Sequence, residues 1–313
     1  MEKPKIIVIV GPTASGKSAL GLELAKRING EIISCDSMQI YKEMNIGTAK
    51  PTEEEQKQVQ HYLIDFVSPN ARYSVSDFKK DAEKAIEEVL KKGKVPILVG
   101  GTGLYINSLL YNINYVDEEY DEEYRKKLEK RAEVEGLDKL YDEAMRIDKE
   151  ATEKISPNDK KRILRILEIY NKTGLTKTEQ DKLSTQVEPK YNYLVFGISI
   201  ERELLYERIN KRVDVMLEEG LVEEVEEIYK KYNEFPTAMQ AIGYKEVVSY
   251  LKNESSKQEM IEKIKMETRR YAKRQMTWFR RNQEIHWLDG LADKQNNIKI
   301  ILEEYSGEKE QKS

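Results

Sequence analysis

KIIVIVGPTASGKS, residues 5–18, is the stretch that decides the fold of this chain. Residues 5–10 form an apolar, β-branched run, which is typical of a buried strand in a parallel sheet. Residues 11–18 fit the pattern G-x-x-x-x-G-K-[ST], and apolar residues recur with helical spacing from 17 to 28. Such a loop between a strand and a helix points backbone N–H groups inward, where they can hold phosphate oxygens. The sequence therefore predicts a phosphate-binding loop, although the motif does not say whose phosphates it holds.

Each residue type in this loop has a physical role. The glycines permit the tight backbone turn, Lys17 adds a positive charge, and Ser18 offers a hydroxyl group to Mg²⁺. The motif implies phosphate binding but not nucleotide hydrolysis. The residues expected to bind a diphosphate or a nucleotide are Gly11, Pro12, Thr13, Ala14, Ser15, Gly16, Lys17 and Ser18, and Ser18 is also the expected metal ligand.

Strands and helices alternate around this loop. An amphipathic helix is predicted at residues 76–92, between two short apolar strands. This alternation predicts a doubly wound sheet of parallel strands. The strands expected after the first are 31–35, 95–99, 191–200 and a last short one at 284–288. The long helices expected in the C-terminal part are 201–219, 221–232 and 257–281.

The composition changes at residue 117. Residues 117–160 include 16 acidic and 10 basic residues and have no strand pattern. We therefore predict an all-helical insertion at 117–188 in an α/β protein whose P-loop parallel-sheet core comprises residues 1–116 and 189–305 and includes the C-terminal helices. Residues 306–313 are expected to form a flexible tail. The helices expected in the insertion are 121–135, 137–148 and 160–173.

Composition and charge exclude several classes of protein. The formal net charge of −4 excludes a uniformly basic surface for nucleic acid, but not a local basic patch. One cysteine cannot form an internal disulfide, and one cysteine with two histidines cannot build a zinc site of the usual closed type. The early apolar run is too short for a signal peptide or a membrane span. We expect a cytoplasmic protein with no membrane partner, acting as a monomer.

Asp36 is the carboxylate expected nearest to the phosphates. No apolar strand ends in the aspartate of an ordinary Walker B motif, whereas Cys35-Asp36-Ser37 follows the second predicted strand. Open parallel sheets bind their ligands beyond the carboxyl ends of the strands, which is where Asp36 would lie. The alternative is that Asp36 caps a helix or a turn. Cys35 is expected to be a small buried residue rather than a nucleophile.

Further motifs give the chain a specific resemblance. They occur in one order from residue 11 to residue 280, and the blocks that contain DSMQIY and YAKRQ would not occur in a generic P-loop kinase. Together they resemble the bacterial tRNA dimethylallyltransferases, the tRNA isopentenyltransferase family. One departure is Tyr62, where many relatives carry a second histidine, and the zinc finger of some eukaryotic relatives is absent. The matching blocks are GPTASGKS (11–18), ISCDSMQIYKEMNIGTAKP (33–51), QHYLIDF (60–66), VGGTGLY (99–105), SPNDKKRILRILE (156–168), RVDVMLEEGLVEEV (212–225), QAIGYKE (240–246) and TRRYAKRQMTWFR (268–280).

The resemblance implies a reaction. The loop would hold the diphosphate of dimethylallyl diphosphate with Mg²⁺, and an adenine flipped out of tRNA beside the anticodon would enter from the opposite side. The exocyclic amine of adenine is a poor nucleophile, so it needs a base, and Asp36 is suited to that role. Lys17, Thr102 and Arg212 would meet the charge that develops on the departing diphosphate. The alternatives are a plain turn for Thr102 and a solvated helix face for Arg212.

The same resemblance implies contacts with RNA. Residues 263–281 contain eight basic residues and one acidic residue, and on a helix Arg270, Arg274 and Arg281 would share a face that could follow phosphates. A solvated charged face is the alternative, and the aromatic residues of this segment are more typical of a core. The residues expected to contact tRNA are Asp36, Ser37, Met38, Gln39, Thr102, Arg125, Asn158, Asp159, Lys160, Lys161, Arg162, Arg270, Arg274 and Arg281.

Three other functions share part of this pattern. A nucleoside or nucleotide kinase would have the sheet and the phosphate loop but would need ATP and a lid. A prenyltransferase that acts on free adenylate would not need the helical insertion or the basic helix. A non-catalytic RNA-binding ATPase would leave the block around Asp36 unexplained.

Overall fold

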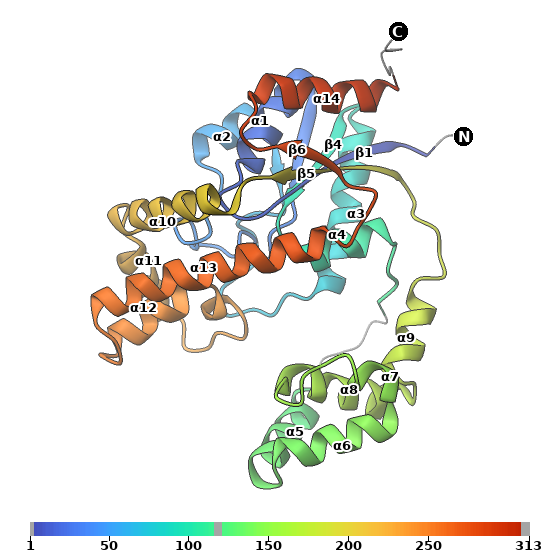
Figure 1. Cartoon of the computed structure of the whole chain (residues 1–313), viewed down its shortest axis with the longest axis vertical. Helices are drawn as coiled ribbons and strands as arrows, with labels where there is room; N and C mark the ends of the chain where they lie inside the picture. The colour runs from blue at the N-terminus through green and yellow to red at the C-terminus, as the bar shows by residue number, and fades with distance from the viewer. Residues whose placement is uncertain (1–2, 116–120, 308–313) are drawn as a thin grey trace. The chain divides into compact units, whose positions relative to one another are not determined.

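The computed structural model describes residues 3–115 and 121–307 (Figure 1). It divides the chain into two compact units. Unit 1 comprises Met1–Leu110 and Lys190–Ser313, and unit 2 comprises Tyr111–Pro189. The expected insertion boundary at 117 and most of the expected tail, 308–313, fall outside the described residues.

Unit 1 is built on one parallel sheet of six strands, in the order β3-β2-β4-β1-β5-β6. All of its strand pairs are parallel. The central strand β1 has no charged residue after Lys5, and its side chains from Ile6 to Val10 are fully buried, as the apolar run predicts. The strands are β1 (Lys5–Val10), β2 (Gly30–Ser34), β3 (His61–Tyr62), β4 (Val95–Gly100), β5 (Asn192–Ser199) and β6 (His286–Asp289).

Helices cover both faces of this sheet, as its alternating side chains require. Ile7 and Ile9 of β1 pack on one face with apolar residues from α1 (Lys17–Arg27), α10 (Arg202–Glu218) and α14 (Lys294–Ser306). Ile6, Val8 and Val10 pack on the other face with residues from α3 (Val75–Lys91) and α4 (Gly103–Leu110). The P-loop α/β class predicted from the sequence is therefore confirmed.

A third apolar cluster lies beside the sheet. It joins α11 (Leu221–Lys231), α12 (Tyr244–Leu251) and α13 (Lys257–Phe279) to the loop that follows β2. Its largest fully buried side chains are Tyr41, from that loop, and Tyr244, from the start of α12. This cluster fixes the loop after β2 against the C-terminal helices. A short helix, α2 (Glu53–Gln58), and a 3-10 turn at Ala238–Gln240 complete the described part of unit 1.

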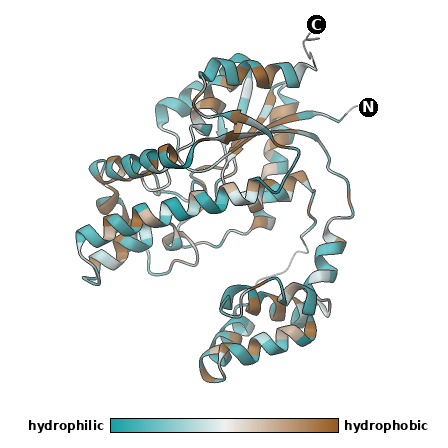
Figure 2. Cartoon of the chain, in the orientation of Figure 1, coloured by the Kyte–Doolittle hydropathy of each residue, from teal (hydrophilic) through white to brown (hydrophobic). Residues whose placement is uncertain are grey.

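The elements in the described part of unit 2 are all helices. Its core contains Leu128, Leu140, Ile163 and Leu167, and Figure 2 shows that its helices carry both hydrophobic and hydrophilic residues. Asp148 connects two of its helices, because its carboxylate accepts hydrogen bonds from Ala151 N and from both the backbone and the hydroxyl of Thr178. The helices are α5 (Glu122–Val134), α6 (Leu137–Ile147), α7 (Lys149–Thr152), α8 (Lys160–Thr173) and α9 (Lys177–Ser184).

No helix in the described part of the chain is both long and apolar enough to cross a membrane. The longest, α13, has 23 residues, but charged side chains occur along its length. It ends at Phe279, two residues before the expected end, so Arg281 lies in the turn after the helix. The expectation that Arg281 shares a helix face with Arg270 and Arg274 is therefore wrong.

Glu224 of α11 holds the loop after β2 in place. Its Oε2 accepts hydrogen bonds from the backbone N–H groups of Asn45 and Ile46, each at 2.8 Å. Its Oε1 accepts from Gly47 N at 3.2 Å and from the hydroxyl of Tyr244 at 2.6 Å. Hydrogen bonds to an ionised acceptor are stronger than neutral ones, so one carboxylate fixes three successive residues of the loop.

We predict that Glu224→Gln destabilises unit 1 by about 1.5–3 kcal/mol, because the amide loses the charge and faces N–H donors with its own NH₂ group. Urea unfolding followed by tryptophan fluorescence measures this, since both tryptophans, Trp278 and Trp287, belong to unit 1. The matched control is Glu227→Gln, an exposed residue of the same helix, which should leave the free energy of unfolding unchanged. Equal unfolding curves for the two variants would contradict the role given to Glu224.

Candidate functional site

The phosphate loop connects β1 to α1 at the carboxyl edge of the sheet. Gly16 has φ +90° and Ala14 has φ +61°, so the chain twice adopts the left-handed conformation that tightens the turn. No side chain caps the N-terminus of α1, which begins at Lys17. The first N–H groups of this helix are therefore directed toward the site of an anion.

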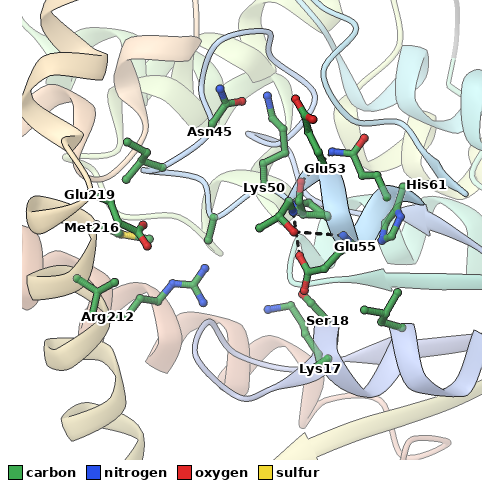
Figure 3. A pocket seen from close by; sticks show the side chains of 18 of the residues that line it. Lys17, Ser18, Asn45, Lys50, Glu53, Glu55, His61, Arg212, Met216 and Glu219 are labelled. Carbon is green, nitrogen blue, oxygen red and sulfur yellow. Dashed lines mark hydrogen bonds between the residues drawn. The ribbon is translucent and has the colours of Figure 1, made fainter. Parts of the chain in front are cut away.

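A cavity of about 810 Å³ opens at this loop (Figure 3). Lys17 and Ser18 of α1 line it, and Arg212 enters it from α10. The opposite wall comes from the loop after β2 and from α2, including Lys50, Glu53 and Glu55. We call this space the Lys17 cavity.

The electrostatics of the Lys17 cavity suit an anion. Burial lowers the pKa of Lys17 from 10.5 to about 8; Asp36 raises it and Arg212 lowers it further. Burial also lowers the pKa of Arg212, opposed chiefly by Asp36. The Nζ of Lys17 makes one hydrogen bond, 3.3 Å to the carbonyl of Pro12, and among the described residues no carboxylate lies within ion-pair distance of Lys17 or Arg212. An anion bound between these cations would regain interactions that both lose on burial.

A second cavity, of about 320 Å³, lies next to the first. Asp36, Ser37 and Met38 line it, together with Thr13 of the phosphate loop. Much of the remaining lining is apolar or comes from α13, namely Val213, Leu221, Ala241, Ile242, Ile264, Thr268, Tyr271 and Arg274. We call this space the Asp36 cavity. Arg212 and Met216, one turn apart on α10, line both cavities.

Asp36 lies directly after β2 and uses one carboxylate oxygen to shape its own turn. Its Oδ1 accepts hydrogen bonds from Met38 N at 2.8 Å and from Gln39 N at 3.3 Å. Within the described part of the chain no hydrogen bond reaches Oδ2. The turn therefore orients the carboxylate and leaves one oxygen for another partner.

Thr102 fixes the same turn from the neighbouring strand. Its hydroxyl accepts a hydrogen bond from Ser37 N at 3.1 Å, and its own N–H donates to the carbonyl of Cys35 at 3.2 Å. The strands approach so closely here that a Cβ on Gly100 would stand 2.2 Å from that carbonyl oxygen. Thr102 is thus placed beside Asp36. Cys35 itself is fully buried, and burial raises the pKa of its thiol far above the usual value.

The other residues expected to contact RNA in unit 1 have different surroundings. The amide of Gln39 donates to the carbonyls of Thr48 and Ala49, so it supports the loop after β2. Arg274 is exposed, lies over the ring of Tyr271 and lines the Asp36 cavity. Arg270 is exposed and pairs with Glu267 at 2.7 Å. Arg281, in the turn after α13, is also exposed.

In unit 2 the expected RNA-contacting residues lie together, except for Arg125. Asn158, Asp159, Lys160, Lys161 and Arg162 lie together at the N-terminus of α8, where Asp159 caps the helix by accepting from Arg162 N. Arg125 of α5 does not join them. Its guanidinium pairs with Glu129 at 2.9 Å and with Glu168 at 3.0 Å, and its side chain is 16% exposed. Glu168 is eight residues beyond Lys160, about 12 Å along the helix.

Sequence reasoning missed several residues of the site. Lys50, whose side chain is 4% exposed, hydrogen-bonds to Asp65 at 2.6 Å and to the carbonyl of Tyr41 at 2.7 Å, and it lines the Lys17 cavity. Met216 lines both cavities, and Gln275 of α13 is buried beside the phosphate loop. A signal was present for Gln275, because its helical spacing from Ala272 and Phe279 places a polar residue on an apolar face.

Comparison with known proteins identifies the family. A family model described as IPP transferase matches residues 39–282. The chain belongs to the IPP transferase family. Two curated proteins similar to it are both called tRNA dimethylallyltransferase. The one from Acetivibrio thermocellus is 52% identical over 91% of each chain, and the one from Oceanobacillus iheyensis is 44% identical over 99% of each. The resemblance read from the motifs is therefore confirmed.

Solved structures of IPP transferases share the fold. A tRNA delta(2)-isopentenylpyrophosphate transferase from Staphylococcus epidermidis is 46% identical, with a TM-score of 0.72 over 97% of this chain and 100% of that one. A eukaryotic dimethylallyltransferase acting on tRNA is 31% identical, with a TM-score of 0.82 over 99% of this chain and 81% of that one. Both likenesses extend over nearly the whole chain, so both units belong to the family fold.

The lowered pKa of Lys17 predicts a pH dependence of anion binding. Below pH 8 Lys17 is an ammonium group in the free protein, and a bound anion raises its pKa. Affinity for pyrophosphate should therefore be level below about pH 8 and fall above it, by up to about tenfold per pH unit.

Isothermal titration calorimetry with pyrophosphate measures this dependence, and the matched control is Lys17→Arg, whose guanidinium does not titrate in this range. The ratio of wild-type affinity to that of the variant removes the titration of pyrophosphate itself. A ratio that stays constant from pH 7 to pH 10 would show that Lys17 does not titrate there.

Proposed function

We propose that this protein transfers the dimethylallyl group from dimethylallyl diphosphate to the exocyclic amine of the adenine 3′-adjacent to the anticodon of tRNA, with release of pyrophosphate. The observation that carries the proposal is the junction of the two cavities. Arg212 and Met216 line both cavities. The phosphate loop with Lys17 lines the first and Asp36 lines the second, and within the described residues no carboxylate pairs with Lys17 or Arg212 and no hydrogen bond reaches Asp36 Oδ2. The names of the relatives support this reaction.

The donor would bind in the Lys17 cavity. Its diphosphate would take the N–H groups at the start of α1, with Lys17 and Arg212 on either side. Its five-carbon tail would reach toward Met216 and the apolar lining of the Asp36 cavity. A donor bound in this way would have its allylic carbon at the junction of the two cavities.

The described residues suit a magnesium ion that is brought in with the donor. No three histidine, cysteine, aspartate or glutamate side chains among them are grouped closely enough to hold a metal by themselves. Mg²⁺ usually takes few protein ligands and completes its shell with phosphate oxygens and water. Ser18, exposed at the start of α1, would supply one ligand. When bound, the ion would neutralise part of the charge of the leaving diphosphate.

The reaction needs one bond to form, one to break and one proton to move. The lone pair of the adenine amine attacks the allylic carbon, whose bond to the diphosphate oxygen breaks, and that oxygen leaves with the electron pair. The free oxygen of Asp36 accepts the proton that the amine loses. Lys17 and Arg212 stabilise the departing diphosphate, while Thr102 holds the turn that carries Asp36. Met216 and the apolar lining of the Asp36 cavity would limit capture of the allylic carbon by water.

The acceptor would enter the Asp36 cavity from the side of α13. A flipped base has lost its stacking and pairing, and contacts to its edge must offset that cost. Ser37 and Met38 line the cavity, and Arg274 offers a guanidinium at its rim. The N-terminus of α8 in unit 2, with Lys160, Lys161 and Arg162, would bind the phosphates of the tRNA. A tRNA substrate would also place the enzyme in the cytoplasm.

Mass analysis tests the function directly. Unmodified tRNA incubated with the protein, Mg²⁺ and dimethylallyl diphosphate should gain the mass of one dimethylallyl group per molecule. In fragments of the tRNA, this added mass should be found on the nucleotide that follows the anticodon. Two further arms replace the donor by ATP and the tRNA by AMP. Transfer of phosphate from ATP would identify a kinase, and modification of AMP with untouched tRNA would identify an adenylate prenyltransferase.

The variant Asp36→Asn tests the proposed base. Asparagine keeps the oxygen that accepts from Met38 N and Gln39 N, so the turn should survive, but it cannot take a proton. The single-turnover rate should fall by about 10²–10⁴-fold with substrate affinities near normal.

Asp293→Asn is the matched control, because Asp293 accepts from the backbone at the start of α14 and should leave the rate unchanged. An Asp36→Asn rate within about threefold of wild type, with chemistry limiting, would rule out the base. A defect that high Mg²⁺ reverses would instead make Asp36 a metal ligand.

A further inference from the structure

Gln275 is a buried polar residue on an apolar helix face. It lies on α13 between Ala272 and Phe279, which are both buried, and it is 5% exposed. Burial of an amide is unfavourable unless both its donor and its acceptor are used. The hydrogen-bond partners of the Gln275 amide therefore indicate its role.

Both ends of the Gln275 amide bind backbone groups of the site. Its Oε1 accepts a hydrogen bond from Thr13 N in the phosphate loop at 2.9 Å. Its Nε2 donates to the carbonyl of Gly101, the residue before Thr102, at 2.9 Å. One side chain thus joins the loop after β1 to the turn after β4, which are separated by about ninety residues in the sequence and come from neighbouring strands.

The fit around this amide is close. A Cβ on Gly101 would stand 2.1 Å from Nε2, so only glycine leaves room for the side chain in this position. Tyr271, one turn earlier on α13, lines the Asp36 cavity. The amide of Gln275 is therefore held by the phosphate loop on one side and by the turn after β4 on the other.

We propose that Gln275 is a positioning residue that sets the distance between the phosphate loop and the Thr102–Asp36 turn. This inference rests on the proposed function, in which the first element holds the diphosphate and the second holds the base. No contact of Gln275 with either substrate is involved. Its amide supplies one acceptor and one donor at a fixed separation, and so it aligns Thr13 N and the carbonyl of Gly101.

Loss of this alignment affects the chemical step more than binding. A displacement of about 1 Å between reacting groups can lower a rate about 10²-fold. Methionine has nearly the length and volume of glutamine but forms neither hydrogen bond. Gln275→Met should therefore lower the single-turnover rate at saturating donor and tRNA by about 10–100-fold. Its affinity for pyrophosphate should fall only severalfold, because Lys17 and the helix N-terminus remain.

The matched control is Gln258→Met, the same substitution at an exposed position of the same helix. Both variants are assayed well below their melting temperatures, measured by tryptophan fluorescence. A purely structural role would lower the melting temperature of Gln275→Met and leave the rate of the folded enzyme unchanged. A rate within about threefold of wild type would therefore overturn the proposal.

Gly101→Ala tests the same contact from the other side, in case Gln275→Met does not fold. The added methyl group displaces the amide from the Gly101 carbonyl and should lower the single-turnover rate as Gln275→Met does. Gln275→Ala leaves space for that methyl group. Adding Gly101→Ala to this variant should therefore lower the single-turnover rate by a smaller factor than adding it to the wild type. If Gly101→Ala lowered the rate by the same factor in the wild type and in Gln275→Ala, the proposal would be overturned.

Pyrophosphate binding separates this proposal from the proposed function. If the protein does not prenylate tRNA, wild type shows no transfer, which overturns the proposed function. Gln275→Met would still weaken pyrophosphate binding severalfold relative to Gln258→Met, because Thr13 N, in the phosphate loop, loses its hydrogen bond to the Gln275 amide. An active wild type with an unaffected Gln275→Met overturns the role of Gln275 alone.

Discussion

Parallel pairing of β1, β2 and β4 is the constraint on which the site depends. Strands that run in one direction end at one edge of the sheet, so the loops that follow them meet there. The phosphate loop follows β1, Asp36 follows β2, and the turn with Thr102 follows β4. Residues from three distant parts of the sequence are thereby brought together. Ser37 N donates to the hydroxyl of Thr102, and Thr13 of the phosphate loop lines the same cavity as Asp36.

The edge of the sheet alone does not make a site, because the cations Lys17 and Arg212 must also be kept from pairing with the carboxylate of Asp36. Lys17 lines the Lys17 cavity, Asp36 lines the adjoining one, and Arg212 lines both. Among the described residues no carboxylate lies within ion-pair distance of Lys17 or Arg212. If Asp36 moved onto either cation it would neutralise the anion site and lose its free oxygen. The backbone turn at Met38 and Gln39 holds it away, with Thr102 behind that turn. The C-terminal helices complete the walls through Arg212 and Met216.

Sequence patterns predicted the strands that have an apolar run and the helices that have a periodic face. They failed where an element is too short to show a period, as in β3, which has two residues, or where a helix follows a glycine turn directly, as in α4. For α2 the sequence does carry a start signal, the capping box of Thr52 with Glu55. The end of α13 was misplaced by two residues because Arg280 and Arg281 fit a helix as well as a turn.

The candidate site was predicted only as far as single motifs extend. The phosphate loop and the block around Asp36 carry their chemistry in consecutive residues. The contact of Gln275 with Thr13 joins positions 262 residues apart, and no local pattern specifies such a pair. Lys50 lies in the block 33–51 that carries the resemblance, but nothing in the sequence indicates its burial, since an isolated lysine is usually exposed. Only the packing around Asp65 and Tyr41 shows that it is buried.

The burial of Cys35 has a practical consequence for measuring how the two units are arranged in solution. It is the one cysteine of the chain, it has no exposed surface, and the raised pKa keeps it in the unreactive thiol form. If one cysteine were introduced at an exposed position of each unit, these two thiols would be the ones available to a maleimide dye. Energy transfer between two such dyes would report the distance between the units, with and without tRNA, in a protein whose native residues are otherwise unchanged.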